Sequence, residues 1–258
     1  MHAILAVAGV VILEMIRRKD VYVLLILTGL ITLSMGSVSI FGDDRTARHL
    51  KELCLALIWL SSILISVMSA ARQLPSEKES RTLLPLLAKP ISRTQVMAGK
   101  FLGCWAASCL CLLAFYTFFT ILTGSREQHW PLVNYLQAFW LHCMFCGIVI
   151  ALTLLGSVHF AAVSSAATIV SIAVAFVLIL GRHLHKVAEQ AGGFAGTLLE
   201  MAYFALPHLE WYDVRDLITH NWPRIEWGAI AFDTVYGAAY IGVFLALACI
   251  RFRKWAIN

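Results

Sequence analysis

Six long apolar segments constrain the fold of this chain more than any other feature of its sequence. Each offers about 20 mostly apolar residues, the length that a helix needs to cross the hydrocarbon core of a bilayer. They are Val21 to Ile40, Leu53 to Ala71, Gly99 to Leu122, Leu132 to Val158, Phe160 to Leu180 and Gly228 to Ile250. With 60% hydrophobic and 14% charged residues, the chain lies outside the range of soluble domains. The sequence therefore predicts an all-α polytopic membrane protein with six transmembrane helices.

The segment before the first predicted span, residues 1–19, is apolar up to Ile16 and ends in three consecutive basic residues. This order is the reverse of a secretory signal, in which the positive charges come first. The apolar stretch is too short to span a bilayer comfortably, and it contains Glu14. We expect an uncleaved amino-terminal interfacial helix. A seventh, tilted span is the weaker alternative.

Basic residues are distributed unevenly between the two sides of this topology. Six spans place both termini on one side, and twelve of the 20 Lys and Arg residues fall in the short segments on that side. Because cytoplasmic loops carry an excess of Lys and Arg, we expect both termini in the cytoplasm. Residues 72–98 then form a cytoplasmic loop and residues 181–227 a large outer loop. The same rule accounts for the net charge of +5, so no nucleic-acid partner is needed.

The large outer segment alternates aromatic and aliphatic residues with acids, and it contains the pair Gly192 and Gly193. Its tryptophans suit the headgroup level of a bilayer, where aromatic side chains gather. We expect a hinge at the glycine pair, with short interfacial or re-entrant helices around it. A separate soluble domain is not expected.

The charged loop between the second and third spans contains two helix-start signals. Ser76 with Glu79, and Ser92 with Gln95, have the spacing of capping boxes, in which serine and the third residue exchange hydrogen bonds with each other's backbone. We expect a short helix that starts at Ser76 and ends near Pro85, because proline inside a helix lacks a donor and clashes with the preceding turn. A second helix is expected to start after Ser92 and to continue into the third span.

Two internal prolines further order this loop. Pro90 restricts the residue before it to an extended conformation, and the leucines before it provide an apolar edge: Leu83, Leu84, Leu86 and Leu87. A solvated connector that serves topology alone is one interpretation. The two start signals favour another, a rigid segment that transmits force to a partner.

The sequence shows no means of catalysis and no energy supply of its own. A phosphate-binding loop is absent, since Gly99 and Lys100 are followed by Phe101 and lack the upstream glycine spacing. Asp233 is the only carboxylate in a predicted span, whereas proton relays use several intramembrane acids and bases. We expect no catalytic, cofactor-binding or metal-binding residues. An intramembrane enzyme is disfavoured because no paired acids, serine–base pair or metal constellation is evident in the spans.

The loop also carries a spaced motif, Glu77-x-Glu79-x-x-Thr82-Leu83-x-x-Leu86-Leu87-x-x-Pro90-x-Ser92-Arg93, followed by Gly99-Lys100-Phe101. This motif resembles the cytoplasmic coupling segment of type-2 ATP-binding-cassette (ABC) exporter permeases. The stretch from Leu206 to Asp216 is similar to one that members carry before the last span, so the resemblance covers nearly the whole chain. It departs at Arg81, where glycine is usual, and at Pro85, where a polar residue is usual.

The resemblance implies a permease subunit of a prokaryotic cytoplasmic (inner) membrane, paired as a homodimer or heterodimer. It implies docking of two cytosolic ATPase subunits, which hold ATP and Mg, while this chain holds no cofactor. The segment from Ser76 to Arg93 would sit with the amino-terminal helix in a groove of the ATPase. The implied coupling residues are Glu77, Glu79, Arg81, Thr82, Leu83, Leu84, Leu86, Leu87, Pro90 and Arg93. The alternative is a membrane scaffold or assembly factor whose loop binds a non-ATPase partner.

Small polar residues recur at helical spacing on the second and fifth spans, and such stripes let helices approach closely. Because these two spans meet across the dimer in the resembling family, we hypothesise a dimer or translocation seam there. Its residues are Ser62, Ser66, Ser69, Ser164, Ser165 and Thr168. Four cysteines near mid-membrane, Cys109, Cys111, Cys143 and Cys146, could form a soft-metal or thiol site. Helix packing is the favoured interpretation of these cysteines.

Overall fold

The computed structural model describes residues 2–17, 22, 26, 29, 44–79, 91–128, 130–160, 162–191, 193–220 and 222–254. Over these ranges the regular structure is helical and contains no strand, which confirms the predicted all-α class. Four helices among them are long and apolar enough to cross a membrane. The predicted first span, Val21 to Ile40, lies almost entirely outside the described residues, so the number of six spans stays a prediction.

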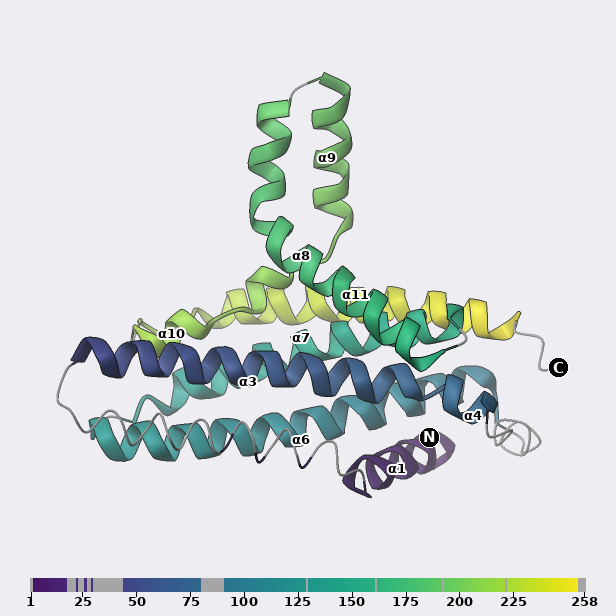
Figure 1. Cartoon of the computed structure of the whole chain (residues 1–258), viewed down its shortest axis with the longest axis horizontal. Helices are drawn as coiled ribbons and strands as arrows, with labels where there is room; N and C mark the ends of the chain where they lie inside the picture. Colours follow the sequence, from purple (N-terminus) through teal and green to yellow (C-terminus); the bar gives the residue numbers. More distant parts are fainter. Residues whose placement is uncertain are drawn as a thin grey trace.

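The four long helices lie side by side in an elongated bundle (Figure 1). They are α3, Asp44–Arg72; α6, Arg93–Glu127; α7, Leu132–His159; and α11, Trp227–Arg253. Each contains one predicted span: Leu53 to Ala71, Gly99 to Leu122, Leu132 to Val158 and Gly228 to Ile250. The central helix is α7, which contacts α3, α6, α8 and α11 and is buried without interruption from Leu141 to Ala151. Its apolar character on all sides is typical of an enclosed helix.

The helix α8, Val163–Ala191, is longer than the predicted fifth span. Its first part, Val163–Ile179, is the apolar portion, and the helix then continues into polar sequence. After a turn, α9, Gly193–Ala205, runs back along α8, and this hairpin stands out from the bundle (Figure 1). Gly193 has a positive φ of 56°, which glycine adopts without strain. The positive φ at Gly193 agrees with the expected hinge, and helices are present around it as expected, although they are longer than predicted.

A connector, residues 206–226, returns the chain from α9 to the bundle. It contains the 3-10 helix η2, Leu209–Tyr212, and the short helix α10, Arg215–Thr219. Four of its apolar side chains are buried: Leu209, Tyr212, Leu217 and Ile218. The connector packs on α3, α7 and α8. We call this end of the bundle the α10 end, and the opposite end, which holds α4, the α4 end (Figure 1).

The amino-terminal helix α1, His2–Arg17, packs along α6 at the α4 end. Two glycines of α6 bring the backbones together: a β-carbon at Gly99 would lie 2.7 Å from Cβ of Val7, and one at Gly103 would lie 2.6 Å from Cβ of Val11. Glycines four residues apart allow close helix packing in membranes. The predicted amino-terminal helix is thus present, and its interfacial position stays a prediction.

Candidate functional site

The α4 end contains the part of the predicted coupling segment that the structure describes. The helix α3 ends at Arg72, and α4 occupies Pro75–Glu79. Residues 80–90 lie outside the described residues. They include seven predicted coupling residues: Arg81, Thr82, Leu83, Leu84, Leu86, Leu87 and Pro90. Glu77, Glu79 and Arg93 flank this gap and can be placed.

One of the two predicted capping boxes is confirmed. The Ser92 hydroxyl accepts a hydrogen bond of 3.2 Å from the Gln95 N–H, and the Ser92 N–H donates to Gln95 Oε1 at 3.0 Å. The box predicted at Ser76 is wrong, because α4 begins one residue earlier, at Pro75. Proline suits the first helical position, where its missing N–H is not needed. The Ser76 hydroxyl donates instead to the Arg72 carbonyl oxygen at 2.5 Å.

An ion pair with a buried lysine joins α4 to α6. Lys100, with a side chain only 1% exposed, places Nζ 2.7 Å from Oε1 of Glu77. The same Nζ donates to the backbone carbonyl oxygen of Gln73 at 3.0 Å and to its Oε1 at 3.3 Å. A buried ammonium group is tolerated where such acceptors replace water. Glu77, which the motif assigns to ATPase coupling, therefore has a partner within its own chain, whereas Glu79 is exposed.

Arg93 links the start of α6 to the end of α11. Its Nη1 donates to the carbonyl oxygens of Phe252 at 2.8 Å and Arg253 at 3.0 Å. Its guanidinium carbon also lies 5.6 Å from the centre of the Phe252 ring. The last carbonyls of a helix lack intrahelical donors, and a cation there also complements the helix dipole. These contacts fix the end of α11 next to the segment that the motif singles out.

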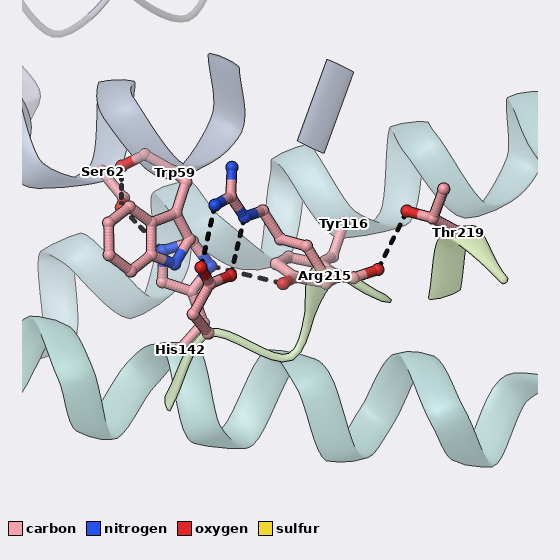
Figure 2. A network of polar contacts seen from close by, with 7 residues as sticks. Trp59, Ser62, Tyr116, His142, Arg215 and Thr219 are labelled. Atoms are coloured by element: carbon pink, nitrogen blue, oxygen red, sulfur yellow. Dashed lines mark hydrogen bonds and ion pairs between the residues drawn. The ribbon is translucent and has the colours of Figure 1, made fainter. Parts of the chain in front are cut away.

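A second polar site lies inside the bundle and joins three long helices (Figure 2). Oγ of Ser62 on α3 lies 2.7 Å from Nε2 of His142 on α7. Nδ1 of the same histidine lies 3.3 Å from the hydroxyl of Tyr116 on α6. Ser62 also donates to the carbonyl oxygen of Trp59 at 2.7 Å. We call Ser62, Tyr116 and His142 the three-helix network.

The proton positions in the three-helix network follow from Ser62. Because its hydroxyl hydrogen goes to the Trp59 carbonyl, Ser62 accepts from Nε2–H of His142. Nδ1 is then the acceptor for the Tyr116 hydroxyl. The structure thus corrects the expectation that no serine–base pair occurs in the spans. This hydrogen-bonding arrangement does not activate Ser62 as a nucleophile, since a nucleophilic serine must give its proton to the base.

The connector covers the three-helix network with an ion pair. Arg215 donates from Nε and Nη2 to the two carboxylate oxygens of Asp213, at 2.6 and 2.8 Å. Hydrogen bonding to Asp213 raises the pKa of the Arg215 guanidinium above its ordinary value. The same guanidinium lies 5.4 Å from the ring centre of Trp59, which stacks on Phe145 at 4.4 Å. The connector is therefore tied to α3 and α7 through stacked groups.

Further hydrogen bonds hold the connector to α7 and α11. The Tyr212 hydroxyl donates to the Asp233 carbonyl oxygen at 2.7 Å. Gln137 donates to the Ile225 carbonyl oxygen at 2.9 Å, and its Oε1 accepts from the Ile225 N–H at 3.0 Å. Connector, α7 and α11 thus form one bonded unit at the α10 end.

The residues of the predicted seam fall into two groups. Ser62 bonds to α7 of its own chain, and Ser66 is fully buried, so these serines do not face an exposed surface. Ser69, half-buried, donates to the Ser66 carbonyl oxygen at 3.0 Å. The α3 half of the hypothesised seam therefore lies inside this chain, and its role in a seam stays a prediction. The α8 half, Ser164, Ser165 and Thr168, is exposed and stays a prediction.

All seven cysteines carry free thiols. Over the described residues, no group of three His, Cys, Asp or Glu side chains is placed to hold a metal ion. Cys143 and Cys146 are buried in α7, and Cys109 and Cys111 are half-buried in α6. The packing role of these four cysteines stays a prediction.

Comparison with known proteins adds one positive finding. No curated protein sequence matches this chain. A protein-family profile described as "ABC-2 family transporter protein" matches residues 3–255, which include α1, the α4 end and the connector. Together with its long apolar helices, this match makes the chain a multi-pass membrane protein with a transport role. In agreement with the resemblance of its charged loop, the chain belongs to the ABC-2 family of transporter membrane proteins.

Proposed function

We propose that this chain is the permease subunit of an ABC exporter, driven by a separate cytosolic ATPase that docks on residues 76–93. Membership of the ABC-2 family supports the transport role. The observation that carries the docking site is the anchoring of its two flanks. On one side Glu77 bonds to Lys100 of α6, and on the other Arg93 bonds to the end of α11. A partner that binds this segment can therefore move two long helices, α6 and α11.

The proposed topology places the α4 end in the cytoplasm of a prokaryote, below its inner membrane. The start of the chain, α4 and the last turn of α11 lie together at this end (Figure 1). Arg93, Arg251 and Arg253 are there as well. The positive-inside rule assigns a side with this charge to the cytoplasm. Both termini would then be cytoplasmic.

In the transport cycle that we propose, the helix bundle transmits movement from the docked ATPases along its length. Two permease protomers, identical or different, pair in the lipid bilayer and bind two ATPases. The ATPases hold the ATP and Mg. Nucleotide-driven closure of the ATPases moves α6 at the α4 end. The three-helix network joins α6 to α3 and α7 further along, so this movement reaches the part of the bundle below the connector. The exposed stripe of Ser164, Ser165 and Thr168 on α8 is the proposed contact between protomers.

The test is co-expression of the tagged chain with the ATPase candidate encoded beside it. We expect co-purification and stimulated ATP hydrolysis, because the docking segment is present and anchored. Leu83→Asp/Leu86→Asp should release the ATPase by placing charge in an apolar contact. Ser125→Asp, at an exposed position near the far end of α6, is the matched control and should retain it. If the parent chain binds no ATPase but retains another protein through the same leucines, the scaffold function replaces this one.

A further inference from the structure

The ion pair between buried Lys100 and partly exposed Glu77 requires a reason beyond stability. Replacing a buried ion pair by apolar residues of similar size is often neutral or stabilising, because two charges must leave water to form it. Lys100 is nevertheless 1% exposed and holds three acceptor atoms, two of them from Gln73. Such a contact is directional: its geometry fixes the distance and orientation between the elements that it joins.

The location of Lys100 shows which elements it joins. Gln73 lies in the turn between α3 and α4, and Glu77 lies in α4. Lys100 lies about two turns into α6 from its capping box. Its neighbour Gly99 is one of the two glycines at which α1 packs closely on α6. One ammonium group therefore connects the start of the proposed docking segment to the helix that supports α1.

Exposure separates the two glutamates of the motif. The Glu77 side chain is 30% exposed and bonded to Lys100, whereas Glu79 is exposed to solvent two residues later. A carboxylate held by a buried lysine cannot turn outward without leaving that ammonium group with no counter-charge. Glu79 is thus free to face a docked partner in a way that Glu77 is not.

We infer that Lys100 is a positioning residue for energy coupling, which passes movement of α4 to α6 through Glu77, and that Glu77 is not a contact of the ATPase. The inference rests on the proposed function, because it assigns a mechanical role inside the docking segment. Movement of α4 displaces the Glu77 carboxylate, and the bonded ammonium group carries α6 with it. An apolar contact of the same area would let the two helices slide past each other.

The experiment compares Lys100→Met, Glu77→Gln and the double variant Glu77→Gln/Lys100→Met in membranes with the bound ATPase. The neutral double variant keeps the packing volume and leaves no buried charge unpaired, so it should fold even where Glu77→Gln alone is destabilised by the buried Lys100 ammonium group left without a counter-charge. Two readouts are needed: co-purification of the ATPase, and labelling of a cysteine at Ser125 by a membrane-impermeant maleimide, with and without vanadate-trapped nucleotide. The chain without the Ser125→Cys change gives the background labelling.

In the parent complex, trapped nucleotide should change the labelling rate at position 125. The double variant should keep the ATPase but lose this nucleotide-dependent difference. Glu79→Gln, the matched control, should show the opposite pattern, with weaker ATPase binding and a preserved difference in the complexes that form. If Lys100 had only a structural role, its replacement would affect folding. It would not change the nucleotide-dependent difference in labelling at position 125 in a complex that has folded.

Two results would overturn the inference. One is a double variant that binds the ATPase and keeps the nucleotide-dependent labelling difference. The other is release of the ATPase by the folded double variant but not by Lys100→Met, which would make Glu77 a docking contact. Failure of the parent chain to bind any ATPase is a separate result, since it refutes the proposed function and this inference together.

Discussion

Oγ of Ser62 lies 2.7 Å from Nε2 of His142, although 80 residues separate them in the sequence. The same imidazole receives the Tyr116 hydroxyl on its other nitrogen, at 3.3 Å. One side chain of α7 therefore completes the hydrogen bonding of groups on α3 and α6. Its removal takes the acceptor from the buried Tyr116 hydroxyl and leaves Ser62 with its bond to Trp59, and an unsatisfied buried group costs about 1–3 kcal/mol.

His142→Phe should consequently destabilise the chain in detergent by about 2 kcal/mol, on the scale of one unsatisfied buried group. His159→Phe is the matched control, because this histidine lies on the same helix but is exposed. Thermal unfolding followed by size-exclusion chromatography measures both. Equal melting temperatures for the two variants would show that the network contributes nothing.

Gly237→Ala and Gly242→Ala should change stability in opposite directions. A β-carbon at Gly237 would lie 2.6 Å from the Tyr212 hydroxyl oxygen, whereas one at Gly242 would have no neighbour within 4 Å. The first substitution should cost about 1–3 kcal/mol through overpacking. The second should gain up to about 1 kcal/mol, because alanine favours the helix over glycine. Detergent melting curves give the sign. Adding Tyr212→Phe to Gly237→Ala should recover part of the loss, and no recovery would place the clash elsewhere.

Gly103→Leu should detach α1 from α6. The added side chain would meet Cβ of Val11 at 2.6 Å and the carbonyl oxygen of Ala8 at 2.9 Å, and a backbone atom cannot move aside. Hydrogen–deuterium exchange should therefore rise throughout α1, since exchange reports local opening. Gly9→Leu lies on α1 itself in open space and should leave exchange unchanged. Unchanged protection of α1 in the Gly103 variant argues against this packing.

Arg93→Lys should loosen the last turn of α11 despite conserving the charge. The guanidinium contacts two carbonyl oxygens and lies over the Phe252 ring, a combination that a single ammonium group does not reproduce. We expect faster hydrogen–deuterium exchange near Arg253 and unchanged exchange in the first half of α11. If Arg93→Gln and Arg93→Lys both leave this turn protected, the link from α6 to α11 is held by other contacts.

Local sequence signals predicted helices better than their ends. Apolar length located α3, α6, α7 and α11, and the capping box at Ser92 marked the start of α6. The end of α8 was missed because hydropathy falls near Leu180, while the following alanine, glutamate and glutamine residues still favour a helix. The start of α4 was misplaced by one residue because the preference of proline for the first turn outweighed the signal from Ser76.

The polar contacts were less accessible to sequence reasoning because they join distant segments. Polar side chains on apolar helices were the available signal for the three-helix network, since intramembrane polar groups need partners. No spacing rule pairs Ser62 with His142 across 80 residues. The motif placed Glu77 and Lys100 in one pattern, but it could not show that they bond to each other.

The packing of α1 on α6 sets an order on the biogenesis of this protein. The helix α1 is synthesised first, but the surface that receives Val7 and Val11 is made of Gly99 and Gly103 and leaves the ribosome much later. Until then the face of α1 that carries Val7 and Val11 lacks the glycine surface on which it packs. Its docking is therefore a late step, possible only after α6 has been inserted, and it marks a first half of the chain that has been assembled correctly.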